Sequence, residues 1–224
     1  MGECKFQSMY KELFPFWDYV SDSDKELICA NTQLKTYNKG ELVHDGNGCT
    51  GLFIVKEGSL RVSMVSDEGK EVTLYRLFPG DICMLSASCV IEAITFDVFI
   101  EAQEKTQCVL ISGPVFAQVS NRCDKMKIFA LETAVSRFSD VMWVIQQVLF
   151  MSIDKRLAIF LTDEIAKTGS NTVKMTHEQI AKNMGSAREV VSRMLKYFSS
   201  QGIVELSRGG ITVIDRAKLR ELTL

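Results

Sequence analysis

The chain has 224 residues and a formal net charge of −2, and 46% of its residues are hydrophobic. This length supports one large or two ordinary domains with cores, and the small net charge argues against a non-specific coat on nucleic acid. The charge is unevenly divided. Residues 154–224 carry 12 Lys and Arg against 8 Asp and Glu, whereas residues 1–153 carry 14 against 20. The C-terminal third is therefore the part best suited to contact DNA.

The start of the sequence and the pattern of its cysteines indicate a reducing compartment. The first residues lack the apolar run of a signal peptide, and the longest apolar stretch, 141–151, is too short to span a bilayer. The seven cysteines are odd in number, scattered and without a C-x-x-C pair. We therefore expect a soluble, cytoplasmic protein without a membrane partner and without a regular disulfide framework.

Most of the N-terminal half has a residue pattern typical of β-strands. Residues 6–17 predict a short helix, and Ser21 or Ser23 is expected to open a second helix that ends near Ala30. From Thr32 to Ser112, short runs of β-branched and aromatic residues alternate with turn signals. Many short strands with regular turns are typical of a β-sandwich or β-roll.

A heptad pattern of apolar residues follows Asp124. Their spacing alternates between three and four residues, at Ile128, Leu131, Val135, Phe138, Met142, Ile145 and Leu149. This spacing is typical of a coiled-coil seam, whereas a helix that faces its own subunit's core usually shows a wider stripe. We therefore predict a long helix over 124–150 through which two copies associate. Ser152 is then a candidate cap for a helix ending at Gly169.

Two candidate capping boxes lie ten residues apart near the C-terminus. Thr176 is followed three residues later by Gln179, and Ser186 three residues later by Glu189, with Gly185 between them. This spacing predicts helices over about 176–183 and 186–200 joined by a tight turn, as in a helix-turn-helix. A hairpin wing over 203–214 and a short helix over 215–222 should follow.

The second of these helices sorts its side chains by face. At roughly 100° per residue, Glu189, Ser192, Arg193 and Lys196 share one sector, opposite an apolar face. Arg can donate two hydrogen bonds to guanine, Glu can accept one from cytosine, and Ser can contact bases or phosphates. The polar face is predicted to read DNA. The alternative is an ordinary solvated face on which Glu189 serves only as a cap.

These residues resemble the winged helix-turn-helix of the catabolite-activator/FNR family of bacterial transcription regulators. The run Gly-Ser-Ala-Arg-Glu-Val-Val-Ser-Arg at 185–193 carries the resemblance, and its Glu-x-x-Ser-Arg core is similar to the FNR branch. Residues 51–62 and 78–81 resemble the family's double-stranded β-roll. The resemblance implies an α+β protein with a β-roll sensor domain and flanking helices (1–123), a dimerisation helix (124–150) and a winged helix-turn-helix (151–224).

The resemblance also implies roles for single residues. It implies base contacts by Arg188, Glu189, Ser192 and Arg193. DNA phosphate contacts are expected for Thr176, Ser186, Lys196 and, at the wing tip, Arg208. A two-fold dimer would place its recognition helices about 34 Å apart on a pseudo-palindromic operator, with TGA-type half-sites implied by the family. RNA polymerase would be a further partner.

The signal sensed by the roll is the open question. Nucleotide-binding members of the family use a Gly-Glu pair and an Arg followed by Ser or Thr. Here Gly80-Asp81 is followed by no glutamate until Glu92, and no arginine occurs between Arg76 and Arg122. A buried phosphate without a guanidinium partner is costly, so these departures argue against a cyclic nucleotide.

The cysteines and His44 are the residues that bear on other cofactors and effectors. Cys4 and Cys29 are too few for a four-thiolate iron–sulfur cluster, whereas haem is not excluded, because His44, Cys83, Met84 and Cys89 are each possible axial ligands. The candidate effector region comprises Gly80, Asp81, Cys83, Met84, Leu85 and Cys89. Within it, Cys83 and Cys89 form a redox pair or are simply buried small hydrophobes, with the second reading favoured. An apolar small molecule is the third possibility.

Two other classes of protein are weighed against the regulator. A ligand-binding roll without DNA contact would leave the polar face around Arg193 unexplained. A cupin-like enzyme needs two or three His with a carboxylate for its metal, but the roll contains only His44. The sequence therefore favours a dimeric DNA-binding regulator whose roll senses a small molecule or a redox signal, and not an enzyme.

Overall fold

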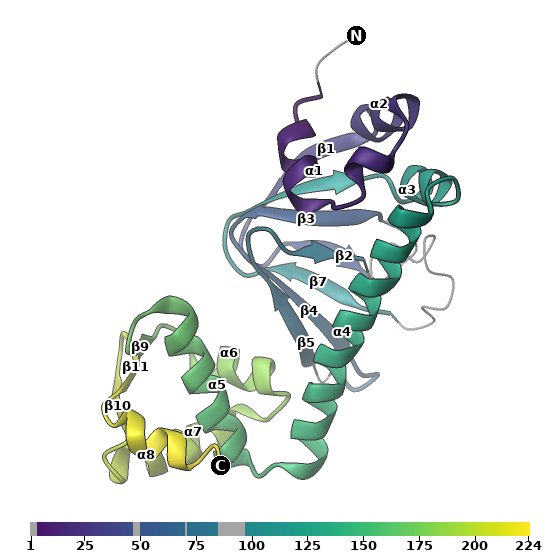
Figure 1. Cartoon of the computed structure of the whole chain (residues 1–224). Coiled ribbons are helices and arrows are strands. Elements are labelled where there is room, and N and C mark those ends of the chain that lie inside the picture. The colour runs from purple at the N-terminus through teal and green to yellow at the C-terminus, as the bar shows by residue number, and fades with distance from the viewer. Residues whose placement is uncertain (1–3, 47–49, 70, 85–96) are drawn as a thin grey trace. The chain divides into compact units, whose positions relative to one another are not determined.

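The structure is a computed structural model that describes residues 4–46, 50–69, 71–84 and 97–224 (Figure 1). The chain divides into two compact units, one of residues 1–64 and 74–141 and the other of residues 65–73 and 142–224. Among the described residues, no helix combines the length and the apolar character needed to cross a membrane. Each unit has its own hydrophobic core, and the two are described in turn.

The first unit begins with short helices, as the sequence predicts. Ser21 caps the second of them, because its Oγ accepts a hydrogen bond from the backbone N–H of Asp24 at 3.2 Å. Figure 1 shows the helices α1, α2 and α3 gathered at the end of the roll where α4 starts. The helical elements of this unit are α1 (Gln7–Leu13), η1 (Trp17–Tyr19), α2 (Asp22–Ala30), α3 (Gly113–Ser120) and the start of α4 (Asp124–Phe150).

Two four-stranded sheets form the predicted roll. Their strand orders are β1-β8-β3-β6 and β2-β7-β4-β5, and the described pairings between strands are antiparallel. The strands are β1 (Thr32–Tyr37), β2 (Leu42–Asp45), β3 (Leu52–Glu57), β4 (Leu60–Val65), β5 (Glu71–Leu77), β6 (Ile82–Cys83), β7 (Phe99–Ala102) and β8 (Thr106–Ile111).

Strand β3 is buried on both faces over residues 52–55. In β3, Leu52 and Ile54 pack into a core shared with the helices, whereas Phe53 and Val55 pack into a second core between the two sheets. Successive side chains of a strand point to opposite faces, so a strand buried on both sides reads as a continuous apolar run. This explains why β3 shows no alternation of polar and apolar residues.

An aromatic cluster joins the N-terminal helices to α4. Tyr10 and Phe14 stack with ring centroids 5.3 Å apart, and Phe14 meets Phe129 of α4 edge to face at 5.7 Å. Tyr10 and Phe14 are almost completely buried, as is Trp17. Burial of each large ring contributes about 2–3 kcal/mol, so this cluster anchors the N-terminal helices independently of any other link.

The second unit contains the winged helix-turn-helix. Its helices and strands surround a single core in which Leu157, Leu195 and Phe198 are fully buried. The small sheet has the order β10-β11-β9, and its hairpin is the predicted wing. The elements are α5 (Ile153–Thr168), β9 (Thr172–Val173), α6 (His177–Met184), α7 (Arg188–Ser200), β10 (Val204–Ser207), β11 (Gly210–Val213) and α8 (Arg216–Glu221).

Candidate nucleic-acid interface

The first helix of the motif starts as predicted. The backbone N–H of Gln179 donates to Thr176 Oγ1 at 3.1 Å, and the N–H of Thr176 donates to Gln179 Oε1 at 2.8 Å. This reciprocal pair is the predicted capping box and fixes the N-terminus of α6. At the other end of α6, Arg156 donates a hydrogen bond to the carbonyl oxygen of Met184.

The second predicted capping box is wrong. The N-cap of α7 is Ala187, without a side-chain cap, and the helix starts at Arg188. Gly185 takes φ +59°, and the N–H of Ser186 donates to the carbonyl of Ala181 at 2.9 Å. These bonds close the C-terminal end of α6, so Ser186 belongs to the turn and does not open the next helix.

The polar face of α7 is open to solvent. Its residues line one surface depression of about 370 Å³, namely Arg188, Glu189, Ser192, Arg193 and Lys196. The sequence predicts DNA contact for all five. Arg188, Glu189, Arg193 and Lys196 are exposed and Ser192 is half-buried. Within the described part of the chain, the charged groups of this face form no ion pair with one another or with other residues.

The opposite face of α7 is packed. Val191, Leu195 and Phe198 are fully buried in the core of the second unit. Those contacts fix the rotation of the helix about its axis, so the polar face cannot turn inward without breaking the core. The polar side chains are thereby presented on a rigid element, which favours recognition of a defined surface.

A second depression lies between the wing and the start of α6. It has a volume of about 350 Å³, and its lining includes Thr176 and Arg208, two of the predicted phosphate contacts. Lys174 and His177 line the same depression and were missed in the sequence. Neither residue lies at a fixed spacing from the other predicted contacts along the sequence. Only the folded wing brings residues 206–211 beside residues 174–179.

The predicted seam residues form an exposed apolar stripe on α4. They lie at alternating spacings of three and four along one helix of 27 residues. Their exposed fractions are 48% for Ile128, 49% for Leu131, 64% for Val135, 64% for Phe138, 44% for Met142, 41% for Ile145 and 65% for Leu149. Side chains of this kind are normally buried, so a continuous exposed stripe marks an interaction surface.

The candidate effector region is partly described. Asp81 Oδ2 accepts a hydrogen bond from the N–H of Phe78 at 2.8 Å, which closes the turn at Gly80. Its Oδ1 lies 3.4 Å from the guanidinium of Arg137 on α4. That guanidinium also lies over the ring of Tyr75 at 5.1 Å and, through Nη1, bonds Asp140 at 3.0 Å. Asp81 therefore links the roll to the long helix.

The side chains of the remaining effector candidates that the structure describes pack into different cores. Cys83 and Met84 are fully buried, but Cys83 packs between the two sheets and Met84 packs against the helices. Leu85 and Cys89 lie outside the described residues. The proposed pair Cys83 and Cys89 is therefore described only at Cys83, whose side chain is closed to solvent.

His44, a possible haem ligand, is held by a neighbour. Its Nδ1 lies 2.6 Å from Thr50 Oγ1, and the side chain is buried. Burial lowers the pKa of His44, and the charges of Asp45 and Asp97 oppose this shift. The neutral imidazole is therefore the form that the folded roll favours.

Comparison with known proteins agrees with both halves of the chain. Residues 34–123 match the cyclic nucleotide-binding domain, and residues 155–222 match the Crp-like helix-turn-helix domain. A crystal structure of a protein assigned to the Crp/Fnr family of transcriptional regulators, from Eubacterium rectale ATCC 33656, is 44% identical with a TM-score of 0.90. The match covers 95% of this chain and 99% of that chain.

More distant relatives are named regulators. The transcriptional activator protein anr of Pseudomonas aeruginosa is 23% identical over 229 residues, which cover 97% of this chain and 91% of the relative. The cAMP-activated global transcriptional regulator CRP of Haemophilus influenzae is 24% identical over 172 residues, covering 74% of this chain and 76% of the relative.

A β-roll of this type joined to a winged helix-turn-helix with a solvent-facing recognition helix defines a DNA-binding transcription regulator with an effector-binding domain. The chain belongs to the Crp/Fnr family. Members of that family are transcription regulators, so the cupin-like enzyme and the module without DNA contact are both set aside.

Proposed function

We propose that the protein is a homodimer that reads a pseudo-palindromic operator with TGA-type half-sites. The observation that carries this proposal is the polar face of α7, where Arg188, Glu189, Ser192 and Arg193 line one solvent-facing depression. Arg and Glu on a helix that enters the major groove can pair with guanine and cytosine, and these are two of the bases in such a half-site duplex. The neighbouring Lys196, together with Thr176, Ser186 and Arg208, would contact phosphates.

Self-association is proposed through the apolar stripe of α4. Seven exposed apolar residues spaced as a heptad seam would become buried if two α4 helices packed side by side. Two-fold symmetry would then present two α7 helices about one DNA turn, roughly 34 Å, apart. This geometry would account for a palindromic operator with a fixed half-site spacing.

We further propose that the roll does not sense a cyclic nucleotide. The sequence has no arginine between Arg76 and Arg122 to meet a buried cyclic phosphate, although the match at residues 34–123 is to a cyclic nucleotide-binding domain. A small apolar molecule or a redox signal is the proposed input. Haem and contact with RNA polymerase stay as proposals, and the expected place of action is the bacterial cytoplasm, where the DNA lies.

The test measures, by fluorescence anisotropy, the affinity of the protein for labelled palindromic duplexes with TGA half-sites. The duplexes differ in the spacing between the two half-sites. The proposal expects saturable binding to one spacing near 10 base pairs, about 10³-fold or more tighter than to a scrambled duplex. Sedimentation velocity should show a dimer at the same protein concentrations. Equal affinity for the palindrome, for each altered spacing and for the scrambled duplex would refute a two-fold reader of this operator.

A further inference from the structure

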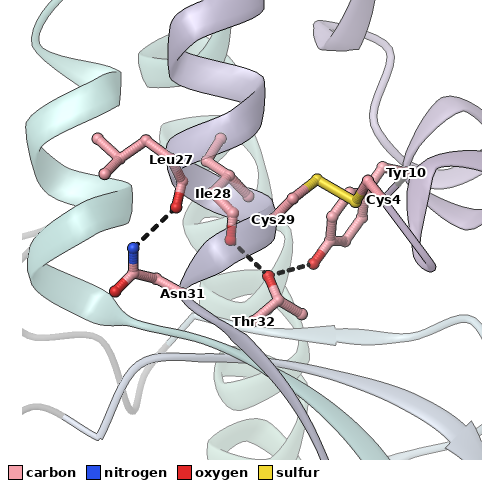
Figure 2. Close-up of a disulfide and its surroundings, with 7 residues drawn as sticks. All are labelled: Cys4, Tyr10, Leu27, Ile28, Cys29, Asn31 and Thr32. Atoms are coloured by element: carbon pink, nitrogen blue, oxygen red, sulfur yellow. Dashed lines mark hydrogen bonds between the residues drawn. A yellow bond between two sulfur atoms is a disulfide. The ribbon is translucent and has the colours of Figure 1, made fainter. Parts of the chain in front are cut away.

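The structure holds a disulfide that no sequence pattern indicated. Cys4, in the segment before α1, is bonded to Cys29 in the last turn of α2, 25 residues further along the chain (Figure 2). Beside it, Tyr10 and Thr32 share a hydrogen bond of 2.7 Å between their hydroxyl groups. The sequence predicts no regular disulfide framework and does not anticipate this single bond.

This disulfide differs from the other described cysteines in its access to solvent. Cys83, Cys108 and Cys123 are buried, whereas Cys4 and Cys29 are both partly exposed. Both also line a surface pocket of about 730 Å³. This volume lies within the range of pockets that bind small molecules. A small thiol could therefore reach the bond between Cys4 and Cys29 but not the buried thiols.

The walls of this pocket carry charges of both signs. Lys5 and Lys25 contribute positive groups, and Asp22 and Glu26 contribute negative groups. Lys25 Nζ lies 3.5 Å from Asp22 Oδ1, so these two charges already face each other, and Lys5 and Glu26 lie outside that pair. A zwitterionic thiol, with carboxylates and an ammonium group, is complementary to such a lining. The pocket thus matches the chemical class of low-molecular-weight thiols that buffer the redox state of cells.

We propose that Cys4 and Cys29 form a reversible thiol–disulfide switch that exchanges with zwitterionic low-molecular-weight thiols and disulfides through this pocket. The argument for reversibility rests on the proposed function, because a DNA-binding regulator works where small thiols keep most cysteines reduced. Disulfides in such a compartment are usually transient and redox-sensing. The accessible pair, and not the buried Cys83, is then the site at which the chain meets a redox signal.

The exchange balances in two steps. The thiolate RS⁻ of a small thiol attacks one sulfur of the disulfide, the bond between Cys4 and Cys29 breaks, and its electron pair leaves on the other sulfur as a thiolate. A second RS⁻ attacks the mixed disulfide and releases the second cysteine thiolate with RSSR. Both cysteines take up protons from solvent. In the reverse direction RSSR is the oxidant, and it receives the two electrons.

Reduction would release Cys4 and Lys5, which precede α1, from Cys29 without unfolding the unit. Tyr10 and Phe14 stay buried by their own ring contacts, so α1 keeps its place when the link at Cys4 opens. Phe14 in turn touches Phe129 on α4, next to the seam residue Ile128. The bond thus tightens a helical cap that packs against the first turns of the proposed dimerisation helix.

The test equilibrates the full-length protein in glutathione buffers from fully reducing to fully oxidising. Unreacted thiols are then trapped by alkylation and located by peptide mass spectrometry. The parent and the matched control Cys123→Ser should convert Cys4 and Cys29 completely and reversibly between the bonded and the alkylated forms. The proposal would be overturned if Cys4 and Cys29 were still recovered as alkylated thiols after the most oxidising buffer. It would also be overturned if they were still recovered as a disulfide after the most reducing buffer.

A second measurement follows the released segment. Trypsin should cut after Lys5 at least about ten-fold faster in the reduced parent than in the oxidised parent, because local opening governs cleavage. In Cys4→Ser and Cys29→Ser the cleavage rate should be high and the same in both buffers. Equal rates in the two states of the parent would overturn the release of the segment. Neither measurement uses DNA, so failure to bind the operator would be scored separately.

Discussion

Replacing Arg193 with alanine should weaken binding to the symmetric duplex while leaving the fold intact. Arg193 is exposed on the polar face of α7 and forms no ion pair with another described residue. Removing an exposed side chain of this kind changes the free energy of unfolding by less than about 0.5 kcal/mol. Any loss of DNA binding can therefore be assigned to the missing contact.

The size of the loss follows from the proposed geometry. A bidentate Arg–guanine pair contributes about 1–3 kcal/mol of discrimination, and a two-fold dimer would carry two such pairs. The variant should therefore lose about 2–6 kcal/mol, which corresponds to a rise in Kd of about 30-fold to about 10⁴-fold. The loss should apply to the TGA duplex and be much smaller on a scrambled duplex.

Fluorescence anisotropy at fixed salt measures both affinities, with Arg220→Ala as the matched control. Arg220 is an exposed arginine on α8, outside the polar face of α7, so its substitution removes the same charge from the same unit. A drop of equal size for Arg193→Ala on the specific and scrambled duplexes would refute base reading by this residue. So would an equal effect of the two substitutions on the TGA duplex.

Three further predictions concern association and stability. Val135→Asp should raise the dimer dissociation constant about 100-fold or more, because dimerisation would then bury an unpaired carboxylate from each copy in the seam. Ser136→Asp, at the neighbouring exposed position, should leave the dissociation constant unchanged. Sedimentation equilibrium measures both constants. Gly51→Ala should destabilise the roll by more than about 2 kcal/mol in urea unfolding, because its Cβ would lie 2.3 Å from a backbone oxygen at φ +122°. Gly80→Ala, also at positive φ but with open space around it, should cost less, and an equal cost would contradict the steric argument. Burial raises the pKa of Tyr37 to about 12, so the unfolded chain loses that proton first and stability should fall between about pH 10 and pH 12. Tyr37→Phe should show a shallower fall over this range, and an unchanged slope would contradict the assignment.

Features with a short repeat along the chain were predicted well from the sequence. The heptad from Ile128 to Leu149 indicated the long helix, because an exposed seam depends only on spacing along one element. The capping box at Thr176 and the two-sided pattern of α7 depend on residues within one or two turns of each other. The exposed polar face of α7 could therefore be predicted before the fold was known.

Local signals failed where two solutions compete over the same residues. Ser186 has the spacing of a helix cap, yet its N–H completes the end of α6 and α7 starts later. Both arrangements satisfy backbone groups locally, and the core contacts of α7 decide between them. Pattern alone gives no weight to those contacts.

Contacts between distant segments were decided only by the tertiary structure. The neighbours Cys83 and Met84 face different cores, because Cys83 packs between the two sheets and Met84 packs against the helices. Cys4 meets Cys29, and Asp81 meets Arg137, because the fold closes long loops that leave no periodic trace in the sequence. The sequence by itself determined the polar and apolar faces of α7, since these depend on local spacing, and its motifs indicated the class of protein by resemblance to a family. Which thiols are accessible was fixed by packing.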